Sequence, residues 1–184
     1  MPGSRLHLAT PVAVPEREFR AVAGLFATGV TVVSTLHGGR GRGMTANAFA
    51  SVSLDPPLVL VCVRHDSEMR RLLDAHETFT VSVLSADQRG VAAWFADPAR
   101  PEGRAQFDAV GWHLGPATGA PVISGALAWL ECAVSERVVA GDHVVVFGRV
   151  LGLGAGQPGE PLLFFAGEYG IVAPPPPVAV RALP

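Results

Sequence analysis

The chain has 184 residues, of which 49% are hydrophobic and 16% are charged, and its net charge is -2. This length fits one domain with its own core. The balanced charge provides no basic surface for nucleic acid or anionic lipid, and no apolar run is long enough to cross a membrane. The apolar composition favours a surface buried between two copies, so a homodimer is expected. The balanced charge favours small-molecule chemistry, and a cytoplasmic location is expected because no signal peptide or membrane span is predicted.

The two ends of the chain differ in composition from the middle. Residues 1–15 are expected to be a flexible leader, because prolines interrupt them before an apolar run of signal-peptide length can form. A single domain is expected over residues 16–173, followed by a Pro-rich extended tail at residues 174–184. Cys62 and Cys132 are far apart in apolar stretches, which is typical of buried thiols. No histidines stand at metal-ligand spacing, so no metal is predicted.

The first part of the chain predicts one helix followed by strands. Apolar side chains at helical spacing predict an amphipathic helix within residues 16–28, ended by Gly29. The glycine-rich residues 37–43 predict a turn. Strands are expected on both sides of this turn and beyond it, over residues 30–36, 46–53 and 58–63.

The second part of the chain is rich in predicted strands. A short helix is expected after Asp66 and Ser67, both of which are good N-caps, and Ser85 with Gln88 matches a capping box that begins another helix. Strands are expected over residues 79–84, 112–114, 126–138, 143–153 and 161–165. Many strands with few helices predict a mainly β fold, an antiparallel barrel flanked by a few helices.

Two glycine patterns look like dinucleotide fingerprints. Gly154-x-Gly156-x-x-Gly159 is a literal GxGxxG, but an apolar strand rather than a helix is expected after it. Gly41-x-Gly43 follows a strand, yet the residues after it alternate at strand spacing. No helix N-terminus would therefore meet a pyrophosphate, and a Rossmann fold is not predicted.

The segment from Thr45 to Pro57 is rich in small residues and hydroxyl groups. A flat ring can approach such a backbone closely. Thr45, Asn47, Ser51 and Ser53 are expected to share one strand face, where they would offer polar groups to a heterocycle, a ribityl chain or a phosphate. An ordinary polar strand face remains the alternative at this point.

In several segments, taken in order, the sequence resembles the flavin reductase-like family, small reductases that supply reduced flavin to two-component monooxygenases. The resemblance extends over about residues 16–170. It is carried by residues 27–33, 45–57, 79–84, 95–96, 119–121, 126–134, 141–150 and 161–165, and by Tyr169. It implies an FMN-binding split barrel of Greek-key type, and a homodimer with flavin near the interface.

The resemblance also implies which residues hold the flavin. The matching segment contacts the isoalloxazine in that family, which assigns cofactor contacts to Thr45, Ala46, Asn47, Ala48, Ser51, Val52 and Ser53. The phosphate is expected near Arg64 and Ser67, where a cation and a helix start coincide, and near Gln88 and Arg89. Asp66 and Glu68 would repel the phosphate if they faced it.

Two further residues match positions near the family's pocket. His143 is the expected catalytic residue: a neutral imidazole there could hydrogen-bond the nicotinamide or the flavin edge, and hydride transfer needs no general base. Its alternative is a histidine that only begins a strand. Tyr169 is expected beside the flavin, with the alternative that it fills the end of the barrel.

The function that the resemblance implies is an NAD(P)H:flavin oxidoreductase. It would reduce FMN or FAD with NADH or NADPH and pass reduced flavin to a separate oxygenase component. Two alternatives remain. One is a flavin-retaining split-barrel oxidoreductase that acts on its own substrate, and the other is a non-catalytic flavin- or haem-binding module.

Overall fold

The structure is a computed structural model that describes residues 13–172. The predicted tail at residues 174–184, and all but the last three residues of the predicted leader at 1–15, lie outside the described residues. No described helix has the length and apolar character needed to cross a membrane.

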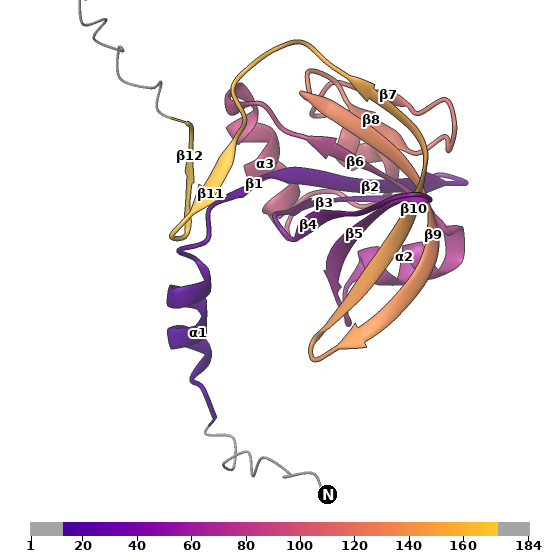
Figure 1. Cartoon of the computed structure of the whole chain (residues 1–184). Coiled ribbons are helices and arrows are strands. Elements are labelled where there is room, and N and C mark those ends of the chain that lie inside the picture. Colours follow the sequence, from indigo (N-terminus) through magenta and orange to yellow (C-terminus); the bar gives the residue numbers. More distant parts are fainter. Residues whose placement is uncertain (1–12, 173–184) are drawn as a thin grey trace, which may run out of the picture.

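A seven-stranded antiparallel sheet forms the body of the molecule, with its strands in the order β3-β2-β6-β9-β10-β5-β4 (Figure 1). In chain order these strands are β2 (Thr31–His37), β3 (Arg40–Ala46), β4 (Phe49–Leu54), β5 (Pro57–Arg64), β6 (Thr78–Val83), β9 (Ala128–Ala140) and β10 (His143–Ala155). The expected turn at residues 37–43 is shorter than predicted, because β3 already begins at Arg40.

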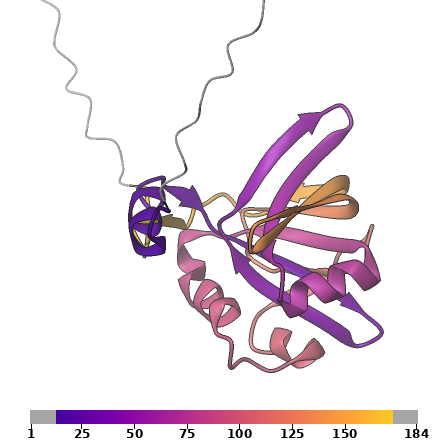
Figure 2. The same ribbon diagram turned by 90° about the horizontal axis from the view of Figure 1, so that it is seen from below.

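The two edge strands of this sheet, β3 and β4, are consecutive in the chain. Only Asn47 and Ala48 separate them. Because two residues span at most roughly 7 Å, the two edges must approach each other, and the sheet curls into an open barrel (Figure 2). The prediction of a mainly β, antiparallel split barrel is confirmed. The prediction of one continuous strand over residues 46–53 is wrong, since the chain turns at Asn47–Ala48.

Side chains that alternate along the strands fill the barrel. On β5, Val59, Val61 and Val63 are buried while the residues between them are partly exposed, as expected for a strand with one inward face. Helix α2 (Glu68–His76) closes one side with Met69, Leu72 and Leu73. A second cluster lies under helix α3 (Arg89–Ala96) and contains Phe95 and Phe107, the latter from the 3-10 helix η2 (Gly103–Phe107).

The predicted capping residues begin α2 and the helical segment that contains α3. The Ser67 hydroxyl caps α2 by accepting a hydrogen bond from the Arg70 N–H at 3.1 Å, so Ser67 rather than Asp66 is the cap. Ser85 and Gln88 form the predicted capping box, which begins the 3-10 helix η1 (Ala86–Gln88) that leads into α3.

A buried carboxylate holds the loop between β7 (Trp112–Leu114) and β8 (Pro121–Ile123). Glu131 on β9 is 1% exposed, and its Oε2 accepts hydrogen bonds from the Ala117 N–H, the Thr118 N–H and the Thr118 hydroxyl at 2.8–2.9 Å. We expect Glu131→Gln to lower the free energy of unfolding by about 1–3 kcal/mol, since it removes a charged acceptor. Urea unfolding measures the loss, with the exposed Glu136→Gln as control. Equal stability of the two variants would contradict this account.

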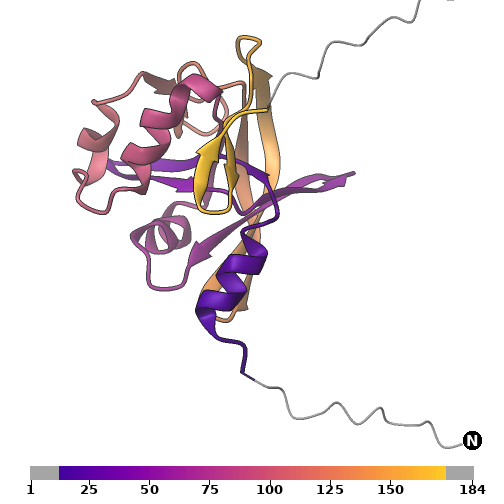
Figure 3. The same ribbon diagram turned by 90° about the vertical axis from the view of Figure 1, so that its left-hand side faces the viewer.

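Helix α1 (Glu16–Ala23) lies apart from the barrel (Figures 1 and 3). It ends five residues before the predicted limit of 28, and none of its residues is buried. The chain continues into β1 (Thr28–Gly29), which forms a small sheet with β11 (Leu163–Phe165) and β12 (Glu168–Gly170). The predicted apolar stripe is present on α1, but it has no protein surface to cover it among the described residues.

Candidate functional site

Three cavities meet at the turn between β3 and β4. The first, the Thr45 cavity, has a volume of about 200 Å³ and is lined by Val30, Thr45, Asn47, Ala96, Phe164 and Tyr169. The second, the arm cavity of about 610 Å³, lies between α1 and the strands and shares Asn47 and Phe164 with the first. The third, the arginine cavity of about 410 Å³, shares Thr45 and Ala96 with the first. The first half of the predicted cofactor segment thus lies at these cavities, since Thr45 and Asn47 each line two of them.

The first half of the predicted segment forms the floor of these cavities. The Thr45 hydroxyl donates a hydrogen bond to the Ala92 carbonyl at 2.6 Å, so it fixes α3 against β3. Ala46 is buried, and its carbonyl accepts from the Thr31 hydroxyl at 2.8 Å. Asn47 and Ala48 are exposed and line the arm cavity. A small, partly apolar floor with an exposed amide suits a flat heterocycle.

The second half of the segment lies elsewhere. Ser51, Val52 and Ser53 belong to β4 and line none of these three cavities. A bulge at this point pairs Ser51 with Val59 and Ser53 with Leu58, which breaks strict alternation. The prediction that Thr45, Asn47, Ser51 and Ser53 share one strand face is therefore wrong, because both the turn and the bulge interrupt the period.

Arg64 and Ser67, predicted to hold a phosphate, both line the arginine cavity. Arg64 forms a bidentate pair with Asp66 at 3.0 and 2.9 Å, and this guanidinium lowers the pKa of the Asp66 carboxyl. The Ser67 hydroxyl donates to the Arg64 carbonyl at 2.8 Å. Asp66 is thus paired with Arg64, whereas Glu68, the other carboxylate that the sequence indicated, lines the cavity and is paired with Arg71 at 2.6 Å.

Two other arginines complete this cavity, and the sequence reasoning missed both. Arg42 comes from β3, and Arg100 from the loop after α3. Arg100 is only 7% exposed; its Nη2 donates to the Gly43 carbonyl at 2.5 Å, and its Nε has no hydrogen-bond partner among the described residues. Burial and the nearby Arg42 lower the pKa of Arg100 to about 10. It therefore stays cationic at neutral pH, and its positive charge lies at the wall of the cavity.

The loop that carries Arg100 also covers the edge of β3. The Gln106 side chain accepts from the Gly43 N–H at 2.7 Å and donates to the Gly41 carbonyl at 2.9 Å. With Arg100 on the Gly43 carbonyl, these contacts satisfy backbone groups that an edge strand leaves unpaired. The glycines that resembled a fingerprint therefore belong to a covered strand edge.

The other predicted phosphate ligands are not brought to Arg64 and Ser67. The Gln88 side chain accepts from the Ser85 N–H at 3.1 Å and donates to the Ser124 carbonyl at 2.8 Å, so both its polar atoms are used. The Arg89 guanidinium lies 5.8 Å from the centre of the Tyr169 ring. Burial raises the pKa of Tyr169, which lines the Thr45 cavity.

His143 lies beside the site rather than in it. It begins β10, where it pairs with Arg64 of β5, and it lines none of the three cavities. Its Nδ1 is 2.8 Å from an Asp142 carboxylate oxygen. Because a carboxylate only accepts, Nδ1 carries the proton and Nε2 is left as an acceptor in the neutral ring. The hydrogen bond from His143 lowers the pKa of Asp142.

Among residues 13–172, no group of three or more His, Cys, Asp or Glu side chains is placed to hold a metal ion. The arrangement instead fits an organic anion with a flat ring. The ring has a small, partly apolar floor at Thr45–Ala48, and the anion has the neighbouring cavity lined by Arg42, Arg64 and Arg100.

Comparison with known proteins places the chain among flavin reductases. The model of the flavin reductase like domain family matches residues 23–173. An NADH-dependent FAD reductase of Streptomyces globisporus is 50% identical over 157 residues, which are 85% of this chain and 86% of the relative. The reductase subunit HsaB of a flavin-dependent monooxygenase from Rhodococcus jostii is 36% identical, over 88% of this chain and 80% of the relative.

A solved structure agrees with this placement. The NADH:FAD oxidoreductase SgcE6 of Streptomyces globisporus, in complex with NAD and FAD fragments, superposes with a TM-score of 0.82 at 46% identity. The match covers 91% of this chain and 99% of that one. The chain therefore belongs to the flavin reductase like family.

Proposed function

We propose that this protein is an NADH-dependent flavin reductase that supplies reduced flavin to a separate oxygenase component. The observation that carries the proposal is the junction at Thr45 and Ala96, where a cavity for a flat ring adjoins a cavity lined by arginines. Relatives that are an NADH-dependent FAD reductase and a reductase subunit of a flavin-dependent monooxygenase support it. We also propose a cytoplasmic location, where nicotinamide cofactors are available.

In this proposal, each part of the site has a distinct task. A bound flavin supplies the hydride-accepting ring. The residues from Thr45 to Ala48 hold that ring flat, and backbone donors there stabilise negative charge on it. Arg42, Arg64, Ser67 and Arg100 hold the phosphate. Arg89 and Gln88 do not contact the phosphate in this proposal: Arg89 positions Tyr169, and Gln88 positions the start of α3. Ser51, Val52 and Ser53 would reach flavin only in an assembled dimer.

His143 is proposed to accept a hydrogen bond from the nicotinamide carboxamide through Nε2, with Asp142 fixing the ring. We expect His143→Ala to raise the KM for NADH about tenfold, the scale of one lost hydrogen bond, while the Kd for flavin stays unchanged. Steady-state kinetics at saturating flavin measures the KM. Asp142→Asn keeps the imidazole and should have a smaller effect. An unchanged KM in His143→Ala would refute the assignment.

The function itself is tested by mixing the protein rapidly with NADH or NADPH and with FMN, FAD or riboflavin in turn, and by following the oxidation of the nicotinamide. We expect nicotinamide oxidation that depends on added flavin, with NADH preferred. Flavin that stays bound through gel filtration, without reduction of added flavin, would favour an oxidoreductase acting on its own substrate. Flavin binding with no nicotinamide oxidation would favour a non-catalytic module.

We further propose that the protein is a homodimer. Exposed apolar side chains support this: Phe19 on α1 is 64% exposed, Phe26 just after α1 is 78% exposed, and Leu54 on the β4 edge is 94% exposed. Burying each such side chain contributes roughly 1.5–3 kcal/mol. The arm cavity lies against the same helix, so a second copy seated on α1 would also enclose it.

A further inference from the structure

Two histidines from distant parts of the chain meet where the turn between β2 and β3 lies against the end of α2. His37 is the last residue of β2, and His76 is the last residue of α2. Their ring centres are 5.1 Å apart, and the ring planes are inclined at 46°. The site described above uses neither side chain, and their distance along the chain gave no reason to pair them.

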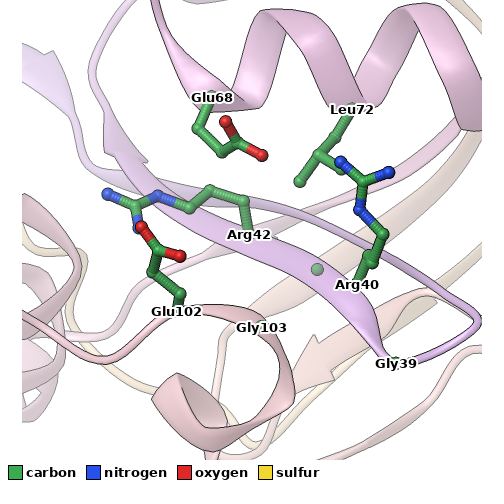
Figure 4. A pocket seen from close by; sticks show the side chains of 8 residues that line it. Gly39, Arg40, Arg42, Glu68, Leu72, Glu102 and Gly103 are labelled. Atoms are coloured by element: carbon green, nitrogen blue, oxygen red, sulfur yellow. The ribbon is translucent and has the colours of Figure 1, made fainter.

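The packing of α2 on the β2–β3 hairpin brings the two rings together. Helix α2 contacts both strands, and Leu72 of α2 lines a cavity of about 330 Å³ with Gly39 and Arg40 of the hairpin (Figure 4). Leu72 is buried, and His76 follows it by four residues, so both side chains lie on the same face of the helix. His76 therefore faces the hairpin.

The ring of His76 is a neutral group with an unused nitrogen. The residue is half-buried, and its Nδ1 is buried without a hydrogen-bond partner among the described residues. Buried polar atoms ordinarily have a partner. Burial, His37 and Arg40 lower the pKa of His76, so its imidazole is neutral at neutral pH. Neutral imidazole is the form that binds metal ions.

The distance between the rings agrees with two histidines on one metal ion. Zn²⁺ binds imidazole nitrogens at about 2.0–2.1 Å in a tetrahedral arrangement, which places two ring centres roughly 5 Å apart. The separation of 5.1 Å matches this value. Within residues 13–172 no third His, Cys, Asp or Glu is grouped with the pair, so water would fill the remaining positions of the ion.

We infer that His37 and His76 together bind a divalent transition metal ion of the kind that prefers imidazole ligands, such as Zn²⁺ or Ni²⁺. An ion held by both rings joins the β2–β3 turn to the end of α2 and stabilises the folded chain. Arg40 lies opposite His37 in the hairpin, where its positive charge opposes a cation. Because Arg40 is exposed, water and salt screen this repulsion. The inference does not depend on the proposed reductase function.

Calorimetric titration with ZnCl2 tests the site in the full chain, after a chelator has removed any metal. Wild-type protein should bind one ion per chain. His37→Ala and His76→Ala should each weaken binding at least about tenfold, since mutation of groups that only support a metal ligand already costs about 10–100-fold. Arg40→Ala should strengthen binding roughly two- to tenfold, because it removes a nearby positive charge. His113→Ala, at an exposed histidine of β7, is the matched control and should leave the affinity unchanged.

Thermal unfolding measures the same site in a second way. At about one hundred times its Kd, Zn²⁺ should raise the Tm of wild-type protein by roughly 5–10 °C. Either alanine variant should lose most of this shift. Mg²⁺ prefers oxygen ligands and should leave the Tm of all variants unchanged.

Three results would overturn the inference. They are the absence of zinc binding by wild-type protein, an affinity that both alanine variants retain, and a loss in only one of them, which would mean that a single histidine holds the ion. If His76→Ala does not fold, His76→Gln removes the ring nitrogens and keeps a polar side chain of similar size.

Discussion

Replacing Gly156 with alanine is expected to destabilise the fold by about 3 kcal/mol, the upper end of the cost of overpacking. An added Cβ would lie 1.9 Å from the carbonyl oxygen of Ala126. That oxygen belongs to the backbone, and the Gly156 N–H donates to the adjacent Leu127 carbonyl at 2.8 Å, so neither segment can move away freely. Urea unfolding followed by circular dichroism measures the loss.

A control lies in the same glycine pattern. A Cβ on Gly159 would meet only the Leu127 Cδ2 atom, at 3.3 Å, and this end of a flexible side chain can yield. We expect Gly159→Ala to cost less than about 1 kcal/mol. Equal losses for the two variants would show that the backbone contact is not the cause. The contrast would also show that Gly156 of the GxGxxG pattern serves packing, as Gly154 does beneath the Trp129 ring.

Replacing both Phe19 and Phe26 with aspartate is expected to convert the proposed dimer to monomer. Two exposed phenylalanines would contribute roughly 3–6 kcal/mol when buried, which is a large share of a dimer's stability. Since α1 also lines the arm cavity, we expect flavin reduction to fall at least about tenfold together with dimerisation. Light scattering after gel filtration gives the mass, and nicotinamide oxidation gives the activity.

The control for this pair is Arg17→Ala, which changes an exposed polar position of α1. It should leave both the mass and the activity unchanged. Phe19 on α1 and Phe26 just after it are both exposed, so the aspartates should not unfold the barrel, and circular dichroism can check this. A wild-type protein that is monomeric and active, or a double variant that remains dimeric, would refute the proposed interface.

Features that depend on neighbours in the chain could be predicted from the sequence. The run of β-branched and other apolar residues over 58–63 predicted the strand β5, because such side chains favour extended backbone. The capping box of Ser85 and Gln88 was also predictable, since its hydrogen bonds join residues three apart. The same reasoning separated the glycine patterns from a dinucleotide fingerprint, because strands and loops follow them rather than helices.

Features that depend on distant segments could not be predicted in this way. The sequence predicted that Thr45 to Ser53 form one surface. In the structure the chain turns at Asn47–Ala48, so the residues before the turn lie on β3 and those after it on β4, at opposite edges of the sheet. No pattern in the neighbouring sequence distinguishes Arg100 from other surface arginines. It lines the arginine cavity because its side chain contacts Gly43, 57 positions away. Gln88 was assigned to a ligand although Ser124 engages its side chain.

The division has a physical basis. Spacing along the chain decides which face of a strand or helix is apolar and where a helix begins, because these depend on backbone geometry repeated over a few residues. The site depends on which segments the curled sheet brings together, so Arg42, Arg64 and Arg100, from three parts of the chain, form one cavity only in the folded protein. The fold class could therefore be predicted from the order of the residues, whereas the anion site depends on the folded sheet, which brings β3, β5 and the loop after α3 together.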